Sequence, residues 1–132
     1  QIVNMSETIT CLLIDDDIDD IEIFNIAIEE LDQNIQCSAA IDGIEALRIL
    51  ETRDFTPDFI FLDLNMPRMN GKQCLAEIRK IPRLSKVPVI IYSTSSSLKD
   101  IEETKKLGAA SFLTKPPTIS GLTEVLGKVF KK

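Results

Sequence analysis

Acidic side chains gather at one point of this sequence. An apolar run, Ile-Thr-Cys-Leu-Leu-Ile at residues 9–14, is followed by five aspartates within six positions. Three further apolar runs end near polar groups that can take part in chemistry: Asp63, then Ser93 with Thr94, then Lys115. Two carboxylates held about 4 Å apart repel by about 4 kcal/mol at an effective dielectric of 20, so clustered aspartates need a cation or a proton.

Asp15, Asp16 and Asp63 are the candidate ligands of such a cation. They offer hard oxygen donors, and the sequence contains no histidine, so Mg²⁺, Mn²⁺ or Ca²⁺ is favoured over softer metals. We expect Mg²⁺, the abundant free dication of cells, with Mn²⁺ or Ca²⁺ as substitutes in a crystal. A metal with few protein ligands keeps positions open for a phosphoryl group. With the Lys115 ammonium and the Ser93 hydroxyl nearby, Asp63 is a candidate nucleophile for phosphoryl transfer.

These residues must be brought together by elements that are far apart in the sequence. Five short apolar runs have the length of β-strands: 9–14, 35–40, 58–64, 88–93 and 110–114. The segments between them carry apolar residues at helical spacing, as at Ile21, Phe24 and Ile28. This alternation predicts an α/β fold, a parallel sheet between two layers of helices. Ligands of such sheets bind beyond the carboxyl ends of the strands, where the polar residues should meet.

Local signals mark the ends of several helices. Asp42 stands three residues before Glu45, as in a capping arrangement. Asn70-Gly71 predicts a turn before the third helix, and Gly108 is expected in a left-handed conformation after the fourth. The serine-rich tract at 93–97 predicts a loop that ends in a helix cap.

An acidic run also has an ordinary structural interpretation. Aspartates cap helices and suit their positive amino ends, so an isolated run is most often a solvated helix start. We interpret Asp19 and Asp20 in that way. The other aspartates gain weight because each polar group falls at the end of a predicted strand.

Size and charge limit the function classes. The 132 residues allow one domain, which we place at 8–131, and residues 1–7 are expected to be disordered or derived from a tag. A net charge of −6 opposes nucleic acid and membranes as partners, since both attract clustered basic residues. The absence of a targeting segment favours the cytoplasm. Cys11, Cys37 and Cys74 form no C-x-x-C pair and are interpreted as core residues of a reducing compartment.

Four motifs resemble those of one bacterial family. "LLIDDD", "FIFLDLNMPRMNG", "PVIIYST" and "SFLTKP" occur in this order, and together they are similar to the receiver domain of two-component response regulators. The chain looks like a stand-alone, chemotaxis-regulator-like receiver from about Thr8 to Phe130. The resemblance implies a doubly wound, five-stranded parallel sheet of order 2-1-3-4-5, flavodoxin-like, with helices on both faces.

The resemblance also implies roles for the clustered residues. Asp63 would be the phosphoacceptor and one of the metal ligands. Asp16 would bind Mg²⁺ directly and Asp15 largely through water, while the backbone carbonyl of Asn65 would supply a further contact. Lys115 would pair with the phosphoryl group or, before phosphorylation, with Asp63.

The same resemblance implies a switch. Ser93, Thr94 and Lys115 would contact the phosphoryl group, and movement of Ser93 would be coupled to the aromatic ring of Phe112. Many relatives have tyrosine in place of Phe112, so packing alone would carry the coupling here. The bond before Pro116 is expected to be cis.

Partners follow from the family resemblance. The phosphodonor would be a sensor histidine kinase or a phosphotransfer protein. Output would pass through the face formed by the fourth helix, the fifth strand and the fifth helix, to a downstream protein or to a second copy. The protein would be a monomer or a phosphorylation-linked homodimer. It would not be an enzyme beyond its self-catalysed phosphoryl acceptance and hydrolysis.

Three alternatives stay open. A hydrolase with an aspartyl-phosphate intermediate generally needs a second aspartate two residues after the nucleophile, where this chain has Asn65. A scaffold that works without phosphorylation would have no need of the acidic cluster. A flavodoxin-like cofactor binder would need a phosphate-cradling glycine loop after the first strand, and none is present.

Overall fold

The computed structural model describes residues 8–52 and 55–131. The prediction for residues 1–7 therefore lies outside the described residues. The strands are β1 (Ile9–Ile14), β2 (Ile35–Ala40), β3 (Phe59–Leu62), β4 (Val89–Ser93) and β5 (Ser111–Thr114). The helices are α1 (Ile18–Glu29), α2 (Gly43–Thr52), α3 (Gly71–Arg79), the 3₁₀ turn η2 (Pro82–Leu84), α4 (Leu98–Lys106) and α5 (Ile119–Phe130).

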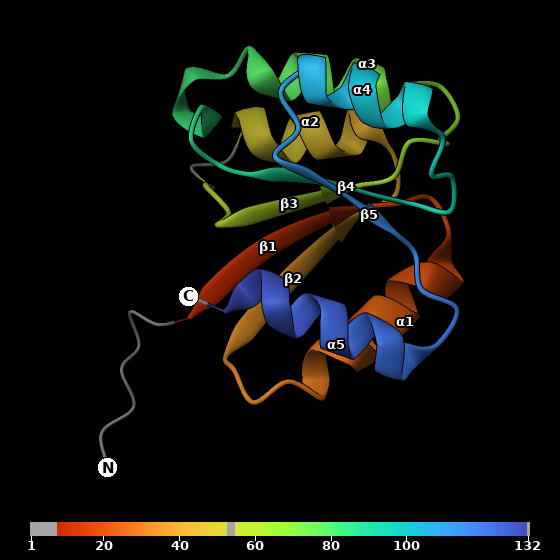
Figure 1. Ribbon diagram of the computed structural model, residues 1–132. Helices are drawn as coiled ribbons and strands as arrows, with labels where there is room; N and C mark the ends of the chain where they lie inside the picture. Colours follow the sequence, from red (N-terminus) through yellow and green to blue (C-terminus); the bar gives the residue numbers. More distant parts are fainter. Residues whose placement is uncertain (1–7, 53–54, 132) are drawn as a thin grey trace.

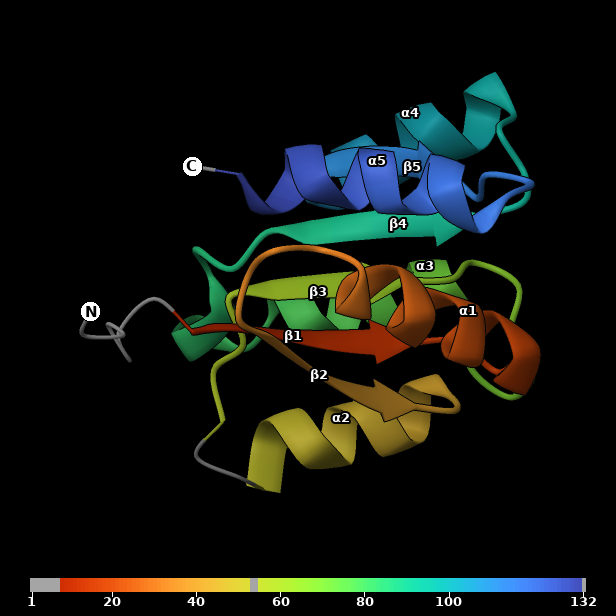
Figure 2. The same ribbon diagram turned by 90° about the horizontal axis from the view of Figure 1, so that it is seen from below.

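The five strands form one parallel sheet of order β2-β1-β3-β4-β5. Helices α2, α3 and α4 cover one face, and α1 and α5 cover the other (Figure 1). The predicted doubly wound, flavodoxin-like fold is thus confirmed. The arrowheads of the strands point toward the same edge of the sheet, where the loop into α1 begins (Figure 2). This carboxyl edge is where the predicted polar residues come together.

The sheet separates two apolar layers of different character. On the α1 and α5 side, Phe24, Phe61, Tyr92 and Phe130 are joined by edge-to-face ring contacts with centroids 5.0–5.9 Å apart. We call these four residues the aromatic core. The opposite layer is mainly aliphatic, with residues such as Leu62. Near-complete burial of strands β1, β3 and β4 on both faces explains why their sequences are apolar without alternation.

Side-chain caps fix where the helices begin. Asp17 accepts hydrogen bonds from the backbone N–H groups of Asp19 and Asp20 at the start of α1. Asn70 forms a capping box with Gln73 at α3, and Ser97 caps α4. The predictions for Asn70-Gly71 and for the serine-rich loop are therefore confirmed.

Two further end signals also hold. Gly108 follows α4 with a φ of +106°, the left-handed conformation that its position predicts. Asp42 accepts from the backbone N–H of Glu45 at 2.8 Å. The return bond runs from the N–H of Ile41, not Asp42, to the Glu45 carboxylate at 2.8 Å. The capping arrangement thus differs from a standard capping box in one bond, because the Glu45 carboxylate binds the N–H of Ile41 instead of that of Asp42.

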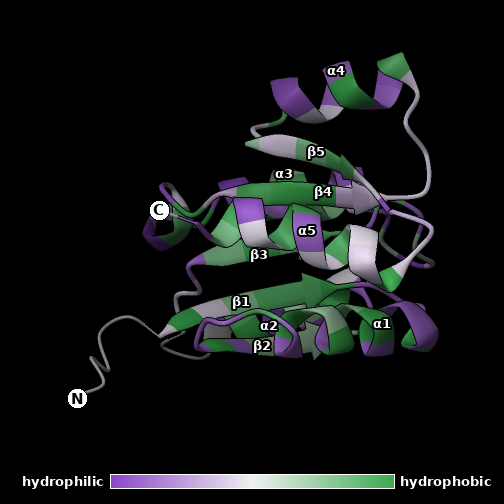
Figure 3. Ribbon diagram, turned by 60° about the horizontal axis from the view of Figure 1, so that its bottom comes forward, coloured by the Kyte–Doolittle hydropathy of each residue, from purple (hydrophilic) through white to green (hydrophobic). Residues whose placement is uncertain are grey.

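The cysteines and the surface agree with an ordinary α/β domain. Cys11 and Cys74 are buried free thiols, as expected of core residues, and burial raises the pKa of Cys74 to about 12. Cys37 is half-buried on the edge strand β2. Strands β1 and β4 are largely hydrophobic, whereas α4 carries long hydrophilic stretches (Figure 3). None of the described helices is both long and apolar enough to span a membrane.

Candidate functional site at the carboxyl edge of the sheet

Three carboxylates meet at the carboxyl edge, as the sequence predicts. Asp15, Asp16 and Asp63 each place one oxygen within 4.8 Å of the others. Asp15 is fully buried and Asp63 nearly so, while Asp16 faces solvent. Two of the three carboxylates therefore lie inside the protein, and the side of the cluster formed by Asp16 is open to solvent.

Close backbone contact fixes Asp63. It directly follows β3, and its N–H donates to the carbonyl of Ile14 in β1 at 2.9 Å. Behind it, the N–H of Gly71 donates to the carbonyl of Leu64 at 2.8 Å. A Cβ at position 71 would lie 2.4 Å from the Asp63 carbonyl oxygen. Only glycine lets the start of α3 approach the acceptor strand so closely.

Lys115 brings a positive charge to the carboxyl edge, but it pairs with different carboxylates from the one expected. Its ammonium donates to Asp15 Oδ2 at 2.8 Å and to Asp20 Oδ2 at 2.7 Å. The expected pairing with Asp63 is therefore wrong for this structure, in which the ammonium acts on Asp63 through space. Two carboxylates, one fully buried, hold the ammonium more strongly than one more distant carboxylate does.

The interpretation of Asp20 as a purely solvated helix residue is also wrong. It does lie in the first turn of α1, but its side chain is only 28% exposed and points at Lys115. Asp19, its neighbour, is exposed as expected. One helical turn beyond Asp16, Asp20 faces the carboxyl edge rather than bulk water.

Burial and neighbouring charges shift the titration of the cluster. Burial raises the pKa of Asp63 to about 6; the Lys115 ammonium opposes this, and the charges of Asp15 and Asp16 add to it. Burial likewise raises the pKa of Asp15 despite its bond from Lys115. Burial alone would lower the pKa of Lys115, but its bonds to Asp15 and Asp20 outweigh burial and raise it. These shifts favour the charged form of Lys115, and in the absence of a cation they allow Asp63 to hold a proton up to about pH 6.

The Lys115–Pro116 bond is trans, because the described residues contain no cis peptide bond. The expectation of a cis bond at Pro116 is therefore wrong. The trans form is the lower in energy by about 0.5–1 kcal/mol before proline. The backbone N–H of Lys115 still bonds the carbonyl of Ser93 at 2.8 Å, so β5 aligns the lysine with the end of β4.

The hydroxyl side of the site comes from the end of β4. Ser93 is fully buried, and its Oγ accepts a hydrogen bond from the N–H of Ser95 at 3.2 Å. Thr94 is exposed. The backbone N–H of Asn65 bonds the Asp63 carboxylate and favours its ionised form. The structure thus brings Ser93 to the edge, whereas the proposed contact of Thr94 and the carbonyl contact of Asn65 stay predictions.

A second polar network joins α3 to the start of α4. Lys72 pairs with Asp100 at 2.7 Å and with Glu103. Asp100 also accepts from the hydroxyl of Ser95 at 3.1 Å. The bonds from Lys72 are the main reason why the pKa of Asp100 and of Glu103 is lowered. The loop that follows Ser93 is therefore tied to α4 through the bond from Ser95 to Asp100, and to α3 through the pairing of Asp100 with Lys72.

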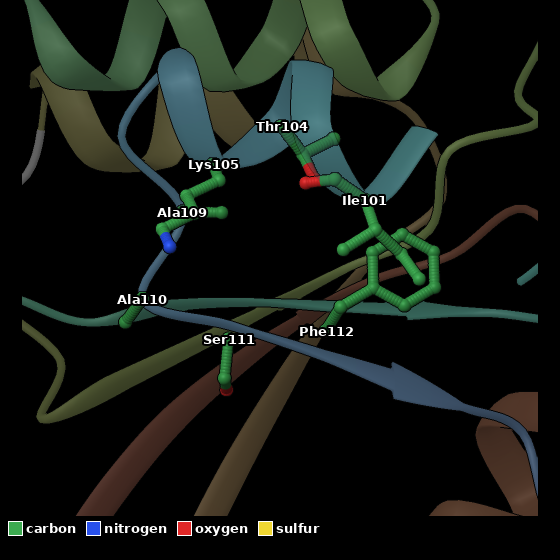
Figure 4. A pocket seen from close by; sticks show the side chains of 7 residues that line it. All are labelled: Ile101, Thr104, Lys105, Ala109, Ala110, Ser111 and Phe112. Carbon is green, nitrogen blue, oxygen red and sulfur yellow. The ribbon is translucent and has the colours of Figure 1, made fainter. Parts of the chain in front are cut away.

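Phe112 lies between β5 and α4. Its ring is half-buried and, with the Ile101 side chain, lies at one side of a pocket of about 220 Å³, which Thr104 and Ala109 also line (Figure 4). Phe112 also packs against the aliphatic layer. The aromatic ring is thus placed where a shift of α4 would change its surroundings.

The donor set and its spacing suit a divalent cation. Ligand oxygens on one Mg²⁺ lie about 3 to 4 Å apart, because each bond is about 2.1 Å long. The observed limit of 4.8 Å among the three carboxylates needs only a small contraction, or one intervening water. Oxygen-only donors with an open side are typical of Mg²⁺, Mn²⁺ or Ca²⁺ sites.

Comparison with known proteins assigns the class. Residues 11–127 match the family described as response regulator receiver domain. The chain is 36% identical to chemotaxis protein CheY-3 of Vibrio cholerae over 93 residues, which are 70% of this chain and 70% of that protein. The chain belongs to the response regulator receiver domain family, which serves two-component signalling.

Solved structures of the family agree in fold. The phosphorylated cyanobacterial phytochrome response regulator RcpA superposes with a TM-score of 0.84 at 29% identity, covering 92% of this chain and 91% of that one. The Mn²⁺-bound form of response regulator Rcp1 has a TM-score of 0.80 at 26% identity, covering 91% and 90%. The described receiver fold is therefore shared along nearly the whole chain.

Sequence reasoning missed several polar residues of the site. Asp20 and Tyr92 both contact Lys115, whose Nζ lies 5.1 Å from the centre of the Tyr92 ring. The available signal for Asp20 was its place one helical turn after Asp16. The Lys72–Asp100 pair has no signal in the sequence, because its two residues lie on different helices that are far apart in the chain.

Proposed function

We propose that this receiver accepts a phosphoryl group on the carboxylate of Asp63, with Mg²⁺ at the acidic cluster. The observation that carries the proposal is the meeting of Asp15, Asp16 and Asp63 within 4.8 Å, with the Lys115 ammonium bonded to one of them. Three carboxylates this close together repel one another unless a cation binds between them. A transferred phosphoryl group in turn needs positive charge around its three oxygens.

The transfer step uses groups of this chain. One Asp63 oxygen forms a bond to phosphorus while the bond from phosphorus to the donor breaks, and the donor group leaves with the electron pair. A phosphohistidine donor leaves as imidazole, and its nitrogen takes a proton from water. The bound dication supplies charge neutralisation and keeps Asp63 ionised. Ser93 can then turn its hydroxyl from Ser95 to a phosphoryl oxygen, and Lys115 can reach another.

The signal would leave through α4, β5 and α5. Movement of Ser93 pulls on the loop that Ser95 ties to Asp100. A shift of α4 then changes the pocket that Phe112 and Ile101 line. We propose a downstream protein, or a second copy of the chain, as the reader of this face, and a histidine kinase or phosphotransfer protein as the phosphodonor.

Mass spectrometry tests the acceptor. The protein is incubated with acetyl phosphate and Mg²⁺, and the intact mass is measured before and after treatment with hydroxylamine, which cleaves acyl phosphates. One phosphoryl group should be added and then lost. Asp63→Asn should abolish the addition, whereas Asp32→Asn, an exposed residue outside the site, should leave it unchanged.

A scaffold that works without phosphorylation is the competing function. It predicts an unchanged mass with the donor intact, and binding of a partner that is the same for Asp63→Asn and the parent chain. Fast turnover of unrelated phosphomonoesters would instead favour a hydrolase. Either result overturns the proposal.

A further inference from the structure

Asp20 shares the ammonium of Lys115 with Asp15, a member of the acidic cluster. The Lys115 side chain is 9% exposed, and its Nζ has two carboxylate partners at nearly equal distance, Asp15 at 2.8 Å and Asp20 at 2.7 Å. Asp20 is not one of the three residues whose oxygens lie within 4.8 Å of one another. The lysine therefore bridges a cluster residue and a residue outside the cluster.

The two partners respond differently to a cation. Asp15 already accepts from the N–H of Asp17 through its other oxygen, and a dication beside it withdraws charge from Asp15 and repels the ammonium. Asp20 stands outside the cluster and keeps its full charge. With the metal bound, Asp20 becomes the stronger of the two partners of Lys115.

Phosphorylation of Asp63 would then give Lys115 a further negatively charged partner. A phosphoryl group on Asp63 adds negative charge and three acceptor oxygens that attract the ammonium. When the ammonium moves toward these oxygens, its bond to Asp20 is weakened, so Asp20 and the phosphoryl group compete for it. The strength of that bond sets how readily the lysine moves.

Resting on the proposed function, we infer that Asp20 is a positioning residue. It holds Lys115 beside the site while the metal occupies the cluster, and it competes with the phosphoryl group for the ammonium. Removing its charge should favour the phosphorylated state, because the competing partner is gone. A charge-assisted hydrogen bond of this exposure corresponds to about a three- to tenfold change in an equilibrium.

Tyr92 offers a direct optical reading of the lysine. It is the single tyrosine, and the chain has no tryptophan, so intrinsic emission comes from one residue. Its ring is 2% exposed and lies 5.1 Å from Lys115 Nζ. Departure of the ammonium from Asp20 toward Asp63 changes the charge over this ring.

The test compares three variants with the parent chain. Asp20→Asn removes the partner, Asp20→Glu keeps the charge, and Asp19→Asn removes an exposed charge from the same helical turn. Each is titrated with acetyl phosphate at saturating Mg²⁺, with the phosphorylated fraction read by mass and Tyr92 emission recorded before and after. Thermal unfolding of each variant verifies that it folds.

Asp20→Asn should raise the phosphorylated fraction at limiting donor, with half-saturation at about a three- to tenfold lower donor concentration. Its Tyr92 emission should change before any donor is added. Asp20→Glu and Asp19→Asn should resemble the parent. If Asp20→Asn and Asp19→Asn behave alike in both readings while the parent chain is phosphorylated, the inference is wrong and the proposed function stands. If the parent chain takes no phosphoryl group, the proposed function fails, and the inference fails with it.

Discussion

Strand β5 lies between two helices that are held in different ways. Helix α5 buries Leu122 and Leu126 in the same layer as the aromatic core, and it supplies Phe130 to that core. Helix α4 buries only Thr104 among its residues and is tied to α3 by the ion pairs of Lys72. Apolar burial is not screened by salt and holds an element firmly, whereas ion pairs that are partly open to solvent contribute less. The comparison indicates that α4 is the element of this face that moves at low free-energy cost.

This contrast suits a receiver. Elements that move in regulation are drawn from the least stable parts of a structure. Only the short loop after Ser93, the last residue of β4, separates the site from α4, so the weakly held helix is joined closely to the carboxyl edge. Under the proposed function, the firmly held α5 would supply a fixed reference for a partner that detects this movement.

The largest expected difference between the two helices is in the free energy of unfolding. Leu126→Ala in α5 removes a fully buried side chain and should cost about 2–5 kcal/mol. Leu98→Ala in α4 changes a side chain that is 71% exposed and should change stability by less than about 0.5 kcal/mol. Urea unfolding measures both. Similar losses would contradict the comparison.

The dependence of stability on pH should arise at the charged carboxyl edge next to α4 and not on the apolar α5 side. Burial raises the pKa of Asp63 to about 6 from an ordinary 3.8, so the folded state holds this proton more tightly than the unfolded state. Stability without metal should therefore fall as the pH rises from about 4 to 6 and stay lower above it, by about 1–3 kcal/mol. Denaturant unfolding across this pH range measures the change.

Two controls sharpen the titration. Asp63→Asn should remove most of the pH dependence and raise stability at pH 7, because the buried charge is gone. Saturating Mg²⁺ should also stabilise the parent chain at pH 7, since the cation binds only the folded cluster. Parallel pH profiles for the parent and Asp63→Asn in the absence of metal would exclude Asp63 as the source.

Two glycines give a matched pair on the two helices. Alanine at position 108 would have to adopt a φ of +106°, and its Cβ would lie 2.8 Å from Cδ of Arg79. Gly108→Ala should therefore destabilise by about 1–2 kcal/mol. Gly127 lies within α5, where alanine is the better helix former by about 1 kcal/mol. The half-buried Leu31 side chain, 3.3 Å from the new Cβ, can shift, so Gly127→Ala should stabilise by up to about 1 kcal/mol. Thermal unfolding of the two variants should show opposite signs.

The smallest effect is expected at the ion pairs. Lys72→Met removes the tie between α3 and α4, so amide hydrogens of α4 should exchange faster, while those of α5 keep their rates. Lys128→Met, an exposed lysine of α5, is the matched control. The parent chain in high salt should behave like Lys72→Met, since salt screens the pair. Unchanged α4 exchange in Lys72→Met would show that apolar contacts, and not the ion pairs, hold this helix.

Periodicity and motif order were enough to predict the fold and the meeting of the acidic cluster. The five runs of apolar residues define the strands, and parallel strands must bring Asp63 and Asp16 to one edge. The partners of Lys115 could not be predicted. A long flexible side chain can reach several carboxylates, and their burial in the folded protein decides which of them it pairs with. Similarly, the link from Lys72 to Asp100 depends on how two helices pack, which local sequence does not encode.

Gly71 shows that the site depends on a residue that carries no functional group. The absence of a side chain there lets the first turn of α3 press against the backbone of Asp63 and Leu64. A genetic screen for loss of signalling should therefore return substitutions at Gly71 alongside those at the charged residues, and such alleles would map to a place that no ligand touches.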